Sequence, residues 1–414
     1  MQNTALAIVF AGTIAGLYLR PFGARDWQVA LAGALAAWAL GPLGFERGLE
    51  ALGESANIVM FFLGLMILAA GAESAGLYAR AALLLGRPRT VRGRVATVLV
   101  LGTLITAILS NDATPLVLTP AVFAAGTALS GTTRRTALAA TFTADGASLL
   151  FPVSNPVNLL FFERFEMGFG EYLSTITPAA AAGIAAMAAV TWLRTPGGRA
   201  DTGDEPRVAL AQRTRAWPAV AVVVLLAVAY TVAGLAGTPL GLVTLAGGGA
   251  LFIAVRMAGP IDSAAYRKHV SPGILVFVAS LLLLVENMVV AGLLDGVADG
   301  LGWIEDRPAL IAILGAAAVA ALLSNLMNNW PAALLLAATI GASPGEHEAL
   351  VAGALIGSAI GANFTMVGSL STVFWLNLVR QNGADFSAGS YAREAFLPTL
   401  AAVVAACSVA ALLV

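Results

Sequence analysis

The chain has 414 residues, of which 59% are apolar and only 11% are charged, and its mean hydropathy is +0.87. A soluble protein carries roughly 25% charged residues, so this composition excludes a water-soluble enzyme. The net charge of −1 excludes the basic surface that nucleic-acid binding requires. One cysteine, Cys407, excludes an intramolecular disulfide and a cysteine metal cluster, and the one lysine, Lys268, does not lie in a phosphate-binding loop. We expect no cofactor and no resident metal.

Apolar runs of the length that crosses a ~30 Å hydrocarbon core recur along the whole chain. They predict an all-α polytopic membrane protein whose amino-terminal run is a retained span and not a cleaved signal peptide. The ten predicted transmembrane helices cover 4–20, 27–43, 56–73, 137–160, 173–193, 217–235, 238–255, 273–293, 349–377 and 395–414.

Two further apolar stretches, 95–128 and 309–341, are interrupted midway by polar residues. Arginines flank both ends of the first stretch and acidic residues flank both ends of the second, and cytoplasmic loops are enriched in arginine and lysine. Each stretch is therefore predicted to enter and leave on one membrane face, as a re-entrant hairpin. The first opens to the cytoplasm, the second opens to the outside, and both chain termini are predicted to be external.

A weak repeat relates the two halves. Ala75-Gly76-Leu77 recurs as Ala291-Gly292-Leu293, and Pro115 recurs as Pro331, each 216 positions later. Because the halves begin on opposite membrane faces, we predict an inverted-topology repeat, an architecture typical of secondary transporters. The first repeat covers 1–194, a cytoplasmic linker covers 195–216, and the second repeat covers 217–414.

Polar residues at membrane depth predict the substrate site. Two predicted helices are interrupted, at 151–158 and 361–369, and irregular backbone is tolerated at that depth only against protein or a water-filled cavity. Freed backbone groups, together with hydroxyl and amide side chains, suit a small hydroxylated or anionic solute; helix kinks and interhelical packing are the alternative. The predicted substrate-binding residues are Ser110, Asn111, Thr114, Ser154, Asn155, Asn158, Asn328, Asn329, Asn363, Thr365 and Ser369.

Carboxylates at membrane depth are candidate proton carriers, since burial favours the protonated form. These are Asp112, Asp145 and Glu286; the alternative is a purely structural role with hydrogen bonds from neighbouring polar groups. The two histidines, His269 and His347, are predicted to be solvated loop residues.

Four segments resemble the ion transporter superfamily, and most closely its ArsB-type arsenite efflux antiporters. Ser110-Asn111-Asp112 resembles the Ser-Asn-Thr hairpin tip of the superfamily's sodium–dicarboxylate symporters, with Asp112 in place of threonine. Asn328-Asn329-Trp330-Pro331 resembles the second tip of the arsenite pumps, with Trp330 as a departure. Segments 154–158 and 365–372 resemble the family's two helix breaks, with Met366 where proline is usual.

The resemblance implies a secondary transporter of the bacterial or archaeal cytoplasmic (inner) membrane. The resemblance also implies export of arsenite and antimonite, as small hydroxylated acids, in exchange for protons, and a separate ATPase subunit that associates with some members. The alternative is a sodium-coupled cation/proton or anion carrier of the same superfamily. An intramembrane aspartyl protease is disfavoured because neither Asp112 nor Asp145 lies in a Gly-x-Gly-Asp context.

Overall fold

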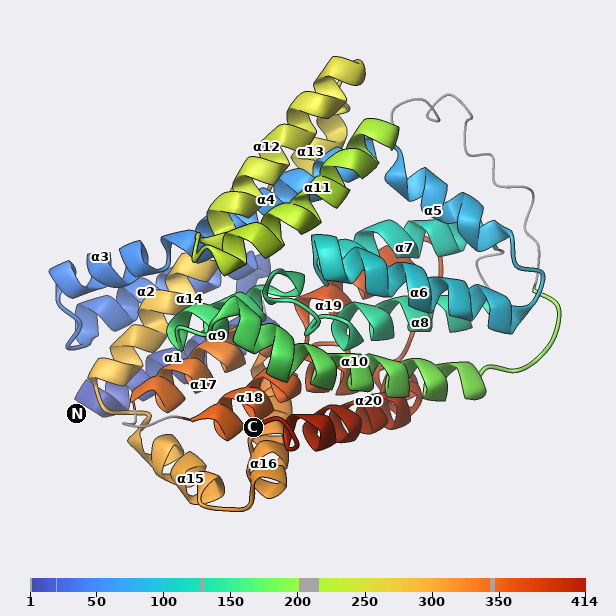
Figure 1. Ribbon diagram of the computed structural model, residues 1–414. Coiled ribbons are helices and arrows are strands. Elements are labelled where there is room, and N and C mark those ends of the chain that lie inside the picture. Colours follow the sequence, from blue (N-terminus) through green and yellow to red (C-terminus); the bar gives the residue numbers. More distant parts are fainter. Residues whose placement is uncertain (1, 20, 127–129, 201–215, 343–346) are drawn as a thin grey trace.

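The protein is described by a computed structural model that covers residues 2–19, 21–126, 130–200, 216–342 and 347–414. Within these ranges the regular elements are helices, and one isolated β-bridge joins Thr90 to Arg199 (Figure 1). The apolar composition explains this outcome, because a helix satisfies all of its own backbone hydrogen bonds without water.

The first half of the chain contains ten α-helices and two short 3₁₀ turns among its described residues. They are α1 (Gln2–Leu19), η1 (Pro21–Gly23), α2 (Asp26–Leu40), α3 (Phe45–Glu54), α4 (Ala56–Ser74), α5 (Leu77–Gly86), α6 (Val91–Leu109), α7 (Ala113–Ala124), α8 (Gly131–Gly146), η2 (Pro152–Ser154), α9 (Pro156–Arg164) and α10 (Phe169–Leu193).

The described part of the second half follows the same order of long, short and interrupted helices. Its elements are α11 (Ala216–Leu235), α12 (Leu240–Ala258), α13 (Ser263–His269), α14 (Pro272–Val290), α15 (Asp295–Glu305), α16 (Ala309–Met327), α17 (Asn329–Ala342), α18 (Glu348–Ala359), η4 (Gly361–Phe364), α19 (Leu370–Gln381) and α20 (Ala388–Ala410).

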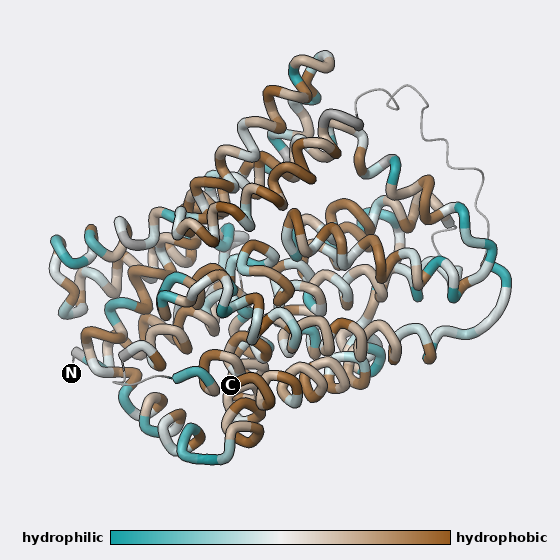
Figure 2. The backbone as a smooth tube through the Cα atoms, viewed as in Figure 1, coloured by the Kyte–Doolittle hydropathy of each residue, from teal (hydrophilic) through white to brown (hydrophobic). Residues whose placement is uncertain are grey.

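Seven helical segments among the described residues are long and apolar enough to cross a membrane: α4, α6, α10, α12, α13 with α14, α16 and α20. Apolar residues dominate the helices, and polar residues concentrate at their ends and in connections (Figure 2). The chain is therefore a multi-span membrane protein. The set differs from the predicted one, because α6 and α16, each predicted as one limb of a hairpin, are 19 residues long and reach spanning length by themselves.

Helix α7 runs back against α6. Thr106 Oγ1 lies 2.7 Å from Thr114 Oγ1 beside the turn, and Arg94 Nη1 donates to Ala125 O over 3.0 Å at the open end. In the second half, α16 likewise packs against α17. Both interrupted spans break where expected: α8 and α9 are separated around η2, and α18 and α19 are separated around η4.

The two halves of the chain pack against each other through three helix pairs. Helix α4 packs on α12 and α2 packs on α14, while α10 packs on α20 (Figure 1). Close approach requires glycine: a Cβ at Gly64 of α4 would lie 2.6 Å from Leu245 N of α12. In the predicted linker, Val91 N donates to Gly198 O and Ala200 N to Arg89 O, so the start of the linker is packed. Residues 201–215 of the linker lie outside the described residues.

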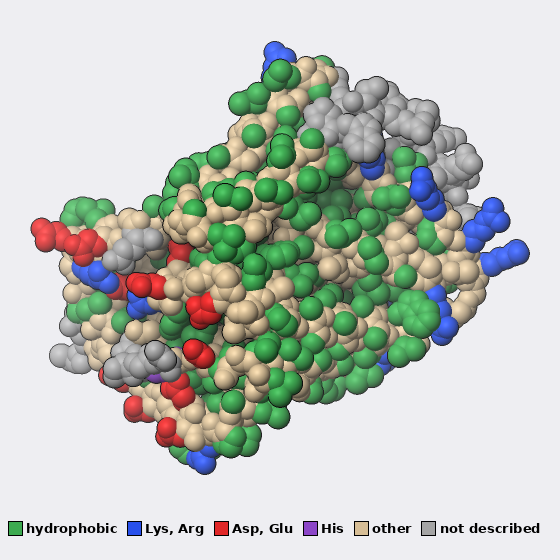
Figure 3. Space-filling model, in the orientation of Figure 1, with side chains coloured by type: hydrophobic (Ala, Val, Ile, Leu, Met, Phe, Trp, Pro, Cys, Tyr) green, Lys and Arg blue, Asp and Glu red, His purple; other side chains and the backbone are tan. Residues whose placement is uncertain are grey.

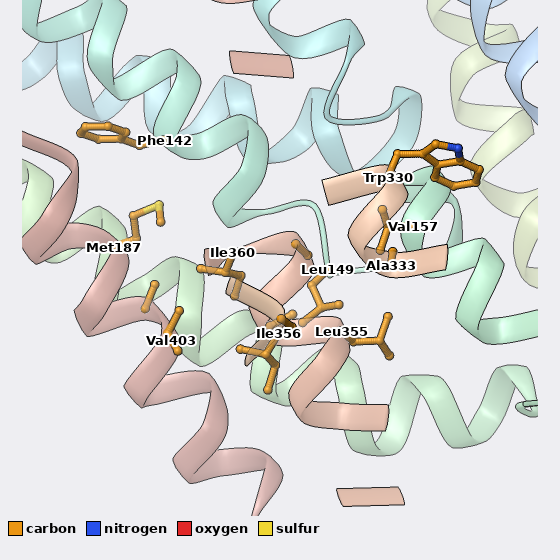
Figure 4. Packing of buried hydrophobic residues seen from close by; sticks show 14 of the residues in the cluster. Phe142, Leu149, Val157, Met187, Trp330, Ala333, Leu355, Ile356, Ile360 and Val403 are labelled. Carbon is orange, nitrogen blue, oxygen red and sulfur yellow. The ribbon is translucent and has the colours of Figure 1, made fainter. Parts of the chain in front are cut away.

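The largest apolar cluster joins the interrupted helices to their neighbours. It contains Phe142 of α8, Leu149 between α8 and η2, Met187 of α10 and Val403 of α20, together with Ile356 and Ile360 at the end of α18 (Figure 4). Close-packed protein interiors have low compressibility and transmit strain from one residue to the next. The two breaks are therefore held in fixed positions relative to each other by side-chain packing.

Candidate substrate site

The turn between α6 and α7 is tied to the first helix break. Ser110 has a φ of 119°, which is rare for a residue other than glycine, and it directs the chain across the end of α6. Asn111 N then donates to Ser154 O over 2.9 Å, and Ser154 Oγ donates to Ala107 O over 3.2 Å. The hairpin tip and the break therefore form one hydrogen-bonded unit.

The turn between α16 and α17 has the same construction. Asn328 has a φ of 76°, and Asn329 N donates to Gly368 O over 2.8 Å. Helix α16 is joined to the second break by Asn325, whose Nδ2 donates to Gly361 O over 2.8 Å. Asn328 Nδ2 also donates to Val367 O over 3.1 Å. Each hairpin tip thus pairs with the break that follows it in the same half.

Asp145 connects the first half's tip to the second half's break. Its Oδ1 accepts hydrogen bonds from Ser369 Oγ at 2.8 Å, Ser371 Oγ at 2.7 Å and Asn111 Nδ2 at 3.3 Å, and its Oδ2 accepts one from Thr372 Oγ1 at 3.0 Å. The carboxylate is fully buried. Four donors from two other segments hold it, as a buried carboxylate requires when no cation is adjacent.

A cavity of about 440 Å³ lies where the two tips meet. Both tips and both breaks line it, through Asn111 and Asp112, Asn328 to Pro331, Asn155 and Pro156, and Met366 and Val367. A second cavity, of about 520 Å³, shares Asp26, Phe62, Asp112 and Asn377 with the first and continues to Arg25, His269 and Gln381. The two cavities are thus adjacent and form one path away from the tips.

Polar atoms without a protein partner line the first cavity. Asn111 Oδ1, Asn155 Nδ2 and Trp330 Nε1 are buried and have no hydrogen-bond partner among the described residues. The Trp330 ring contacts Phe62 edge-on at a centroid distance of 5.3 Å and projects from α17 near Val157 (Figure 4). One acceptor and two donors are therefore available to a bound molecule.

Asp112 is the one acidic side chain of the first hairpin tip, and it lines both cavities. No hydrogen bond or ion pair links its carboxylate to any other residue in the described ranges. The two predicted carriers are therefore placed differently, because Asp145 is enclosed by donors and Asp112 faces the cavity.

Several predicted site residues hold the backbone and do not line either cavity. Asn158 Nδ2 donates to Ser148 O over 2.6 Å, and Asn363 Nδ2 donates to Phe142 O over 3.2 Å. Thr114 Oγ1 donates to Ser110 O over 3.2 Å. The residues of the predicted set that line a cavity are Ser110, Asn111, Asp112, Asn155, Asn328 and Asn329.

The remaining predicted residues lie away from the cavity walls. Thr365 Oγ1 is buried without a partner among the described residues, outside both lining sets. Glu286 lines neither cavity, and its Oε1 accepts from Arg47 Nη2 of α3 at 3.1 Å. The structure does not bring Glu286 together with Asp112 and Asp145.

Both histidines differ from the prediction of solvated loop residues. His269 is 7% exposed, and its Nε2 lies 2.5 Å from Glu73 Oε2 in the wall of the second cavity. His347 Nδ1 lies 2.8 Å from Glu305 Oε1. The prediction of solvated histidines was wrong. Charged neighbours in the sequence indicate a loop, but they do not reveal which helix packs over the histidine side chain.

Sequence reasoning also missed some cavity residues. Asn377 is a polar residue within the predicted span 349–377, which was a usable signal. Ser371 and Thr372 follow the predicted Ser369 closely and, like it, bind Asp145. Asp26 and Phe62 carried no signal, because they come from other helices and reach the cavity only through tertiary packing.

Residues 23–361 match the model of the CitMHS family, described as citrate transporter. The arsenical pump membrane proteins of Escherichia coli and Yersinia enterocolitica are 30% and 31% identical to this chain over 357 and 358 residues, and each alignment covers 83% of both proteins. The crystal structure of the Alcanivorax borkumensis YdaH transporter shares the fold, with a TM-score of 0.58 over 93% of this chain and 96% of that chain at 15% identity. The chain therefore belongs to the CitMHS family of the ion transporter superfamily, as an ArsB-like membrane transporter.

Proposed function

We propose that this transporter exports arsenite and antimonite from the cytoplasm in exchange for protons. One observation carries the proposal: amide groups and a single unpaired carboxylate line the cavity between the two hairpin tips. Relatives named arsenical pump membrane proteins support the same substrate class.

The charges around the first cavity favour an uncharged substrate. The one arginine among its lining residues, Arg380, has its Nε 3.0 Å from Asp385 Oδ1. Asp112 and Asp26 are the other charged lining residues. A citrate-like anion would require unpaired cations and would be repelled by these carboxylates. Arsenous acid is neutral and carries three hydroxyl groups, which match the free acceptor of Asn111 and the free donors of Asn155 and Trp330.

A transporter must release its substrate, and this favours binding of arsenite through its hydroxyl groups over binding by cysteine thiolates. Trivalent arsenic prefers thiolate ligands, but Cys407 is fully buried in α20 and lines neither cavity. Binding by Ser, Asn and backbone groups is weaker than binding by thiolates and permits release on the far side. We assign the substrate contacts to the cavity-lining Ser110, Asn111, Asn155, Asn328 and Asn329. Asn158, Asn363 and Thr114 hold the backbone near these contacts.

We assign proton coupling to Asp112, because it faces the substrate cavity without a partner among the described residues. Proton binding would neutralise its carboxylate and alter the cavity's affinity for hydroxylated acids. Asp145 has a different role, since its four donors fix the position of the second break relative to the first tip.

The proposed topology has ten transmembrane helices and two re-entrant hairpins in an inverted-topology repeat in the cytoplasmic membrane. Reciprocal packing supports it, since α4 contacts α12 and α13 while α14 contacts α2 and α3. Figure 3 shows the basic side chains mainly at one end of the molecule and acidic side chains at the other, with an apolar flank between. The positive-inside rule places the basic end in the cytoplasm.

The orientation of the cavities indicates which side has access to the site. The second cavity leads from the tips to Arg25, His269 and Gln381, residues that this topology places near the cytoplasm. On the proposed topology, we infer that this arrangement admits substrate from the cytoplasm.

Everted vesicles that contain only this protein test the proposal. Arsenite should accumulate under an imposed proton gradient, and a protonophore should abolish accumulation whether or not sodium is present. Accumulation that depends on sodium would instead favour the sodium-coupled carrier, for which the serine and threonine oxygens around Asp145 provide suitable ligands. A separate ATPase subunit stays a prediction from the family resemblance, and the vesicle assay without ATP measures transport independent of it.

A further inference from the structure

A small cavity of about 180 Å³ lies far from the substrate site, at the amino-terminal ends of α8 and α20. Arg134 and Arg135 of α8 line it together with Arg393 and Glu394 of α20. The volume is suitable for a phosphate group. Neither lining set of the substrate cavities includes these four residues, so this cavity is a separate one.

The cavity carries an excess of positive charge. Glu394 Oε2 lies 2.7 Å from Arg135 Nη1 and 3.5 Å from Arg194 Nη2, so one carboxylate is shared by two guanidinium groups. Arg134 is held in place, with its guanidinium 4.1 Å from the centre of the Phe386 ring and Nη1 donating to Asp385 O. Arg393 is exposed and has no hydrogen-bond or ion-pair partner within the described ranges. Three arginines and one glutamate therefore line the cavity, and a fourth arginine, Arg194, shares that glutamate from outside the lining.

The two helix ends add to this positive potential. Ser130 caps α8 by accepting from Thr133 N at 3.1 Å, and Ser387 caps α20 by accepting from Ser390 N at 3.2 Å. Helix amino termini carry a partial positive charge that attracts anions. The arginines and both helix ends thus act on the same small volume.

An apolar strip continues from the cavity along α20. Leu397, Leu400 and Val404 follow Arg393 at helical spacing, and they are 44%, 38% and 45% exposed. Residues four, seven and eleven positions after Arg393 lie on the same helix face. A molecule with a phosphate in the cavity would therefore lay an attached acyl chain on this strip, which a free phosphate would leave uncovered.

We propose that this cavity binds the phosphate headgroup of an anionic phospholipid, at the membrane face that carries the arginines. Basic pockets between transmembrane helices on the cytoplasmic side bind such headgroups. The bound lipid would bridge α8 of the first half and α20 of the second. This inference does not depend on the transported substrate.

Native mass spectrometry of the detergent-purified full chain tests the site, with phosphatidylglycerol and phosphatidylcholine of identical acyl chains as probes. Wild-type protein should retain phosphatidylglycerol preferentially. Arg393→Gln should weaken that binding roughly fivefold, as loss of one arginine near a membrane surface predicts, and Arg393→Lys should restore most of it. The matched control is Arg307→Gln, since Arg307 stacks on Trp303 outside the cavity and should behave as wild type.

Three results would overturn the proposal. They are equal retention of the two lipids, an unchanged affinity in Arg393→Gln, and displacement of phosphatidylglycerol by inorganic phosphate at equal concentration. The last result would identify a site for free phosphate. Because Arg393 is exposed and unpaired among the described residues, its substitution should leave the fold intact, and size-exclusion elution checks this.

Discussion

At the scale of single residues, the two carboxylates near the first hairpin tip have unlike surroundings. Both are aspartates at membrane depth, and the sequence offered no means to separate them. The structure gives Asp145 four hydrogen-bond donors and places Asp112 against both cavities. A carboxylate that must bind and release protons requires access to water, so we propose Asp112 and not Asp145 as the carrier.

Asp112→Asn should remove proton coupling. The amide keeps the size of the side chain but cannot exchange a proton, so arsenite accumulation in everted vesicles should fall to the level seen with a protonophore. Asp112→Glu restores a carboxyl group and should recover part of the transport. Normal accumulation with normal pH dependence in Asp112→Asn would show that another group carries the proton.

Ser371→Ala should destabilise the protein by about 1–3 kcal/mol, the usual cost of removing one hydrogen bond to a buried charged group. Ser371 Oγ donates to Asp145 over 2.7 Å, so its loss leaves the buried carboxylate with three donors. Thermal unfolding in detergent measures the change. Ser408→Ala is the control, because Ser408 is exposed and bonds only within its own helix, and it should change stability by less than about 0.5 kcal/mol. Equal stability of the two variants would contradict the role of Ser371.

At the scale of elements, the polar residues that interrupt helices divide into two groups. Asn158 and Asn363 donate to backbone carbonyl groups and stabilise the non-helical backbone of the breaks. Asn111 Oδ1 and Asn155 Nδ2, in contrast, have no partner among the described residues and line the cavity. Sequence predicted where the helices break, since polar residues and proline within an apolar run mark the positions. It could not assign the two roles, because each depends on the neighbouring helix.

Helix α18 packs against α16 through glycines, and this contact should tolerate no added methyl group. A Cβ at Gly357 would lie 2.2 Å from Ala317 O and 2.6 Å from the Cβ of Ala320. Gly357→Ala should therefore destabilise the protein by about 1–3 kcal/mol through overpacking. The control is Gly249→Ala in α12, where no atom lies within 4 Å and alanine should be neutral or stabilising. Thermal unfolding compares the two, and an unaffected Gly357→Ala would contradict the close packing.

At the scale of the whole molecule, three of the most extensive helix–helix contacts join the two halves: α4 with α12, α10 with α20, and α2 with α14. Because α2 packs on α14 and α4 packs on α12, neither half encloses the site alone. Residues of both hairpin tips line the cavity, as the proposed substrate site at the interface of two repeats requires.

The proposed topology places α15 outside the cell and the start of α20 in the cytoplasm. Gly300 and Gly389 lie in these helices with no atom within 4 Å of an added Cβ, so Gly300→Cys and Gly389→Cys should fold normally. A membrane-impermeant maleimide should label Gly300→Cys in intact cells and Gly389→Cys in everted vesicles. The native Cys407 is buried and should remain unlabelled. Labelling of both variants from the same side would exclude the inverted topology.

Sequence alone determined the class of the protein, the positions of most helices and the four regions in which polar residues interrupt them. These features depend on local composition and spacing, because an apolar run in lipid must close its own backbone hydrogen bonds. Only the tertiary structure decided that Asp145 is enclosed, that His269 is buried against Glu73, and that Asp26 and Phe62 complete the cavity. Glu73 and His269 are 196 positions apart, and Asp145 is 224 positions from Ser369. The partner of such a polar side chain is fixed by helix packing that hydropathy does not encode.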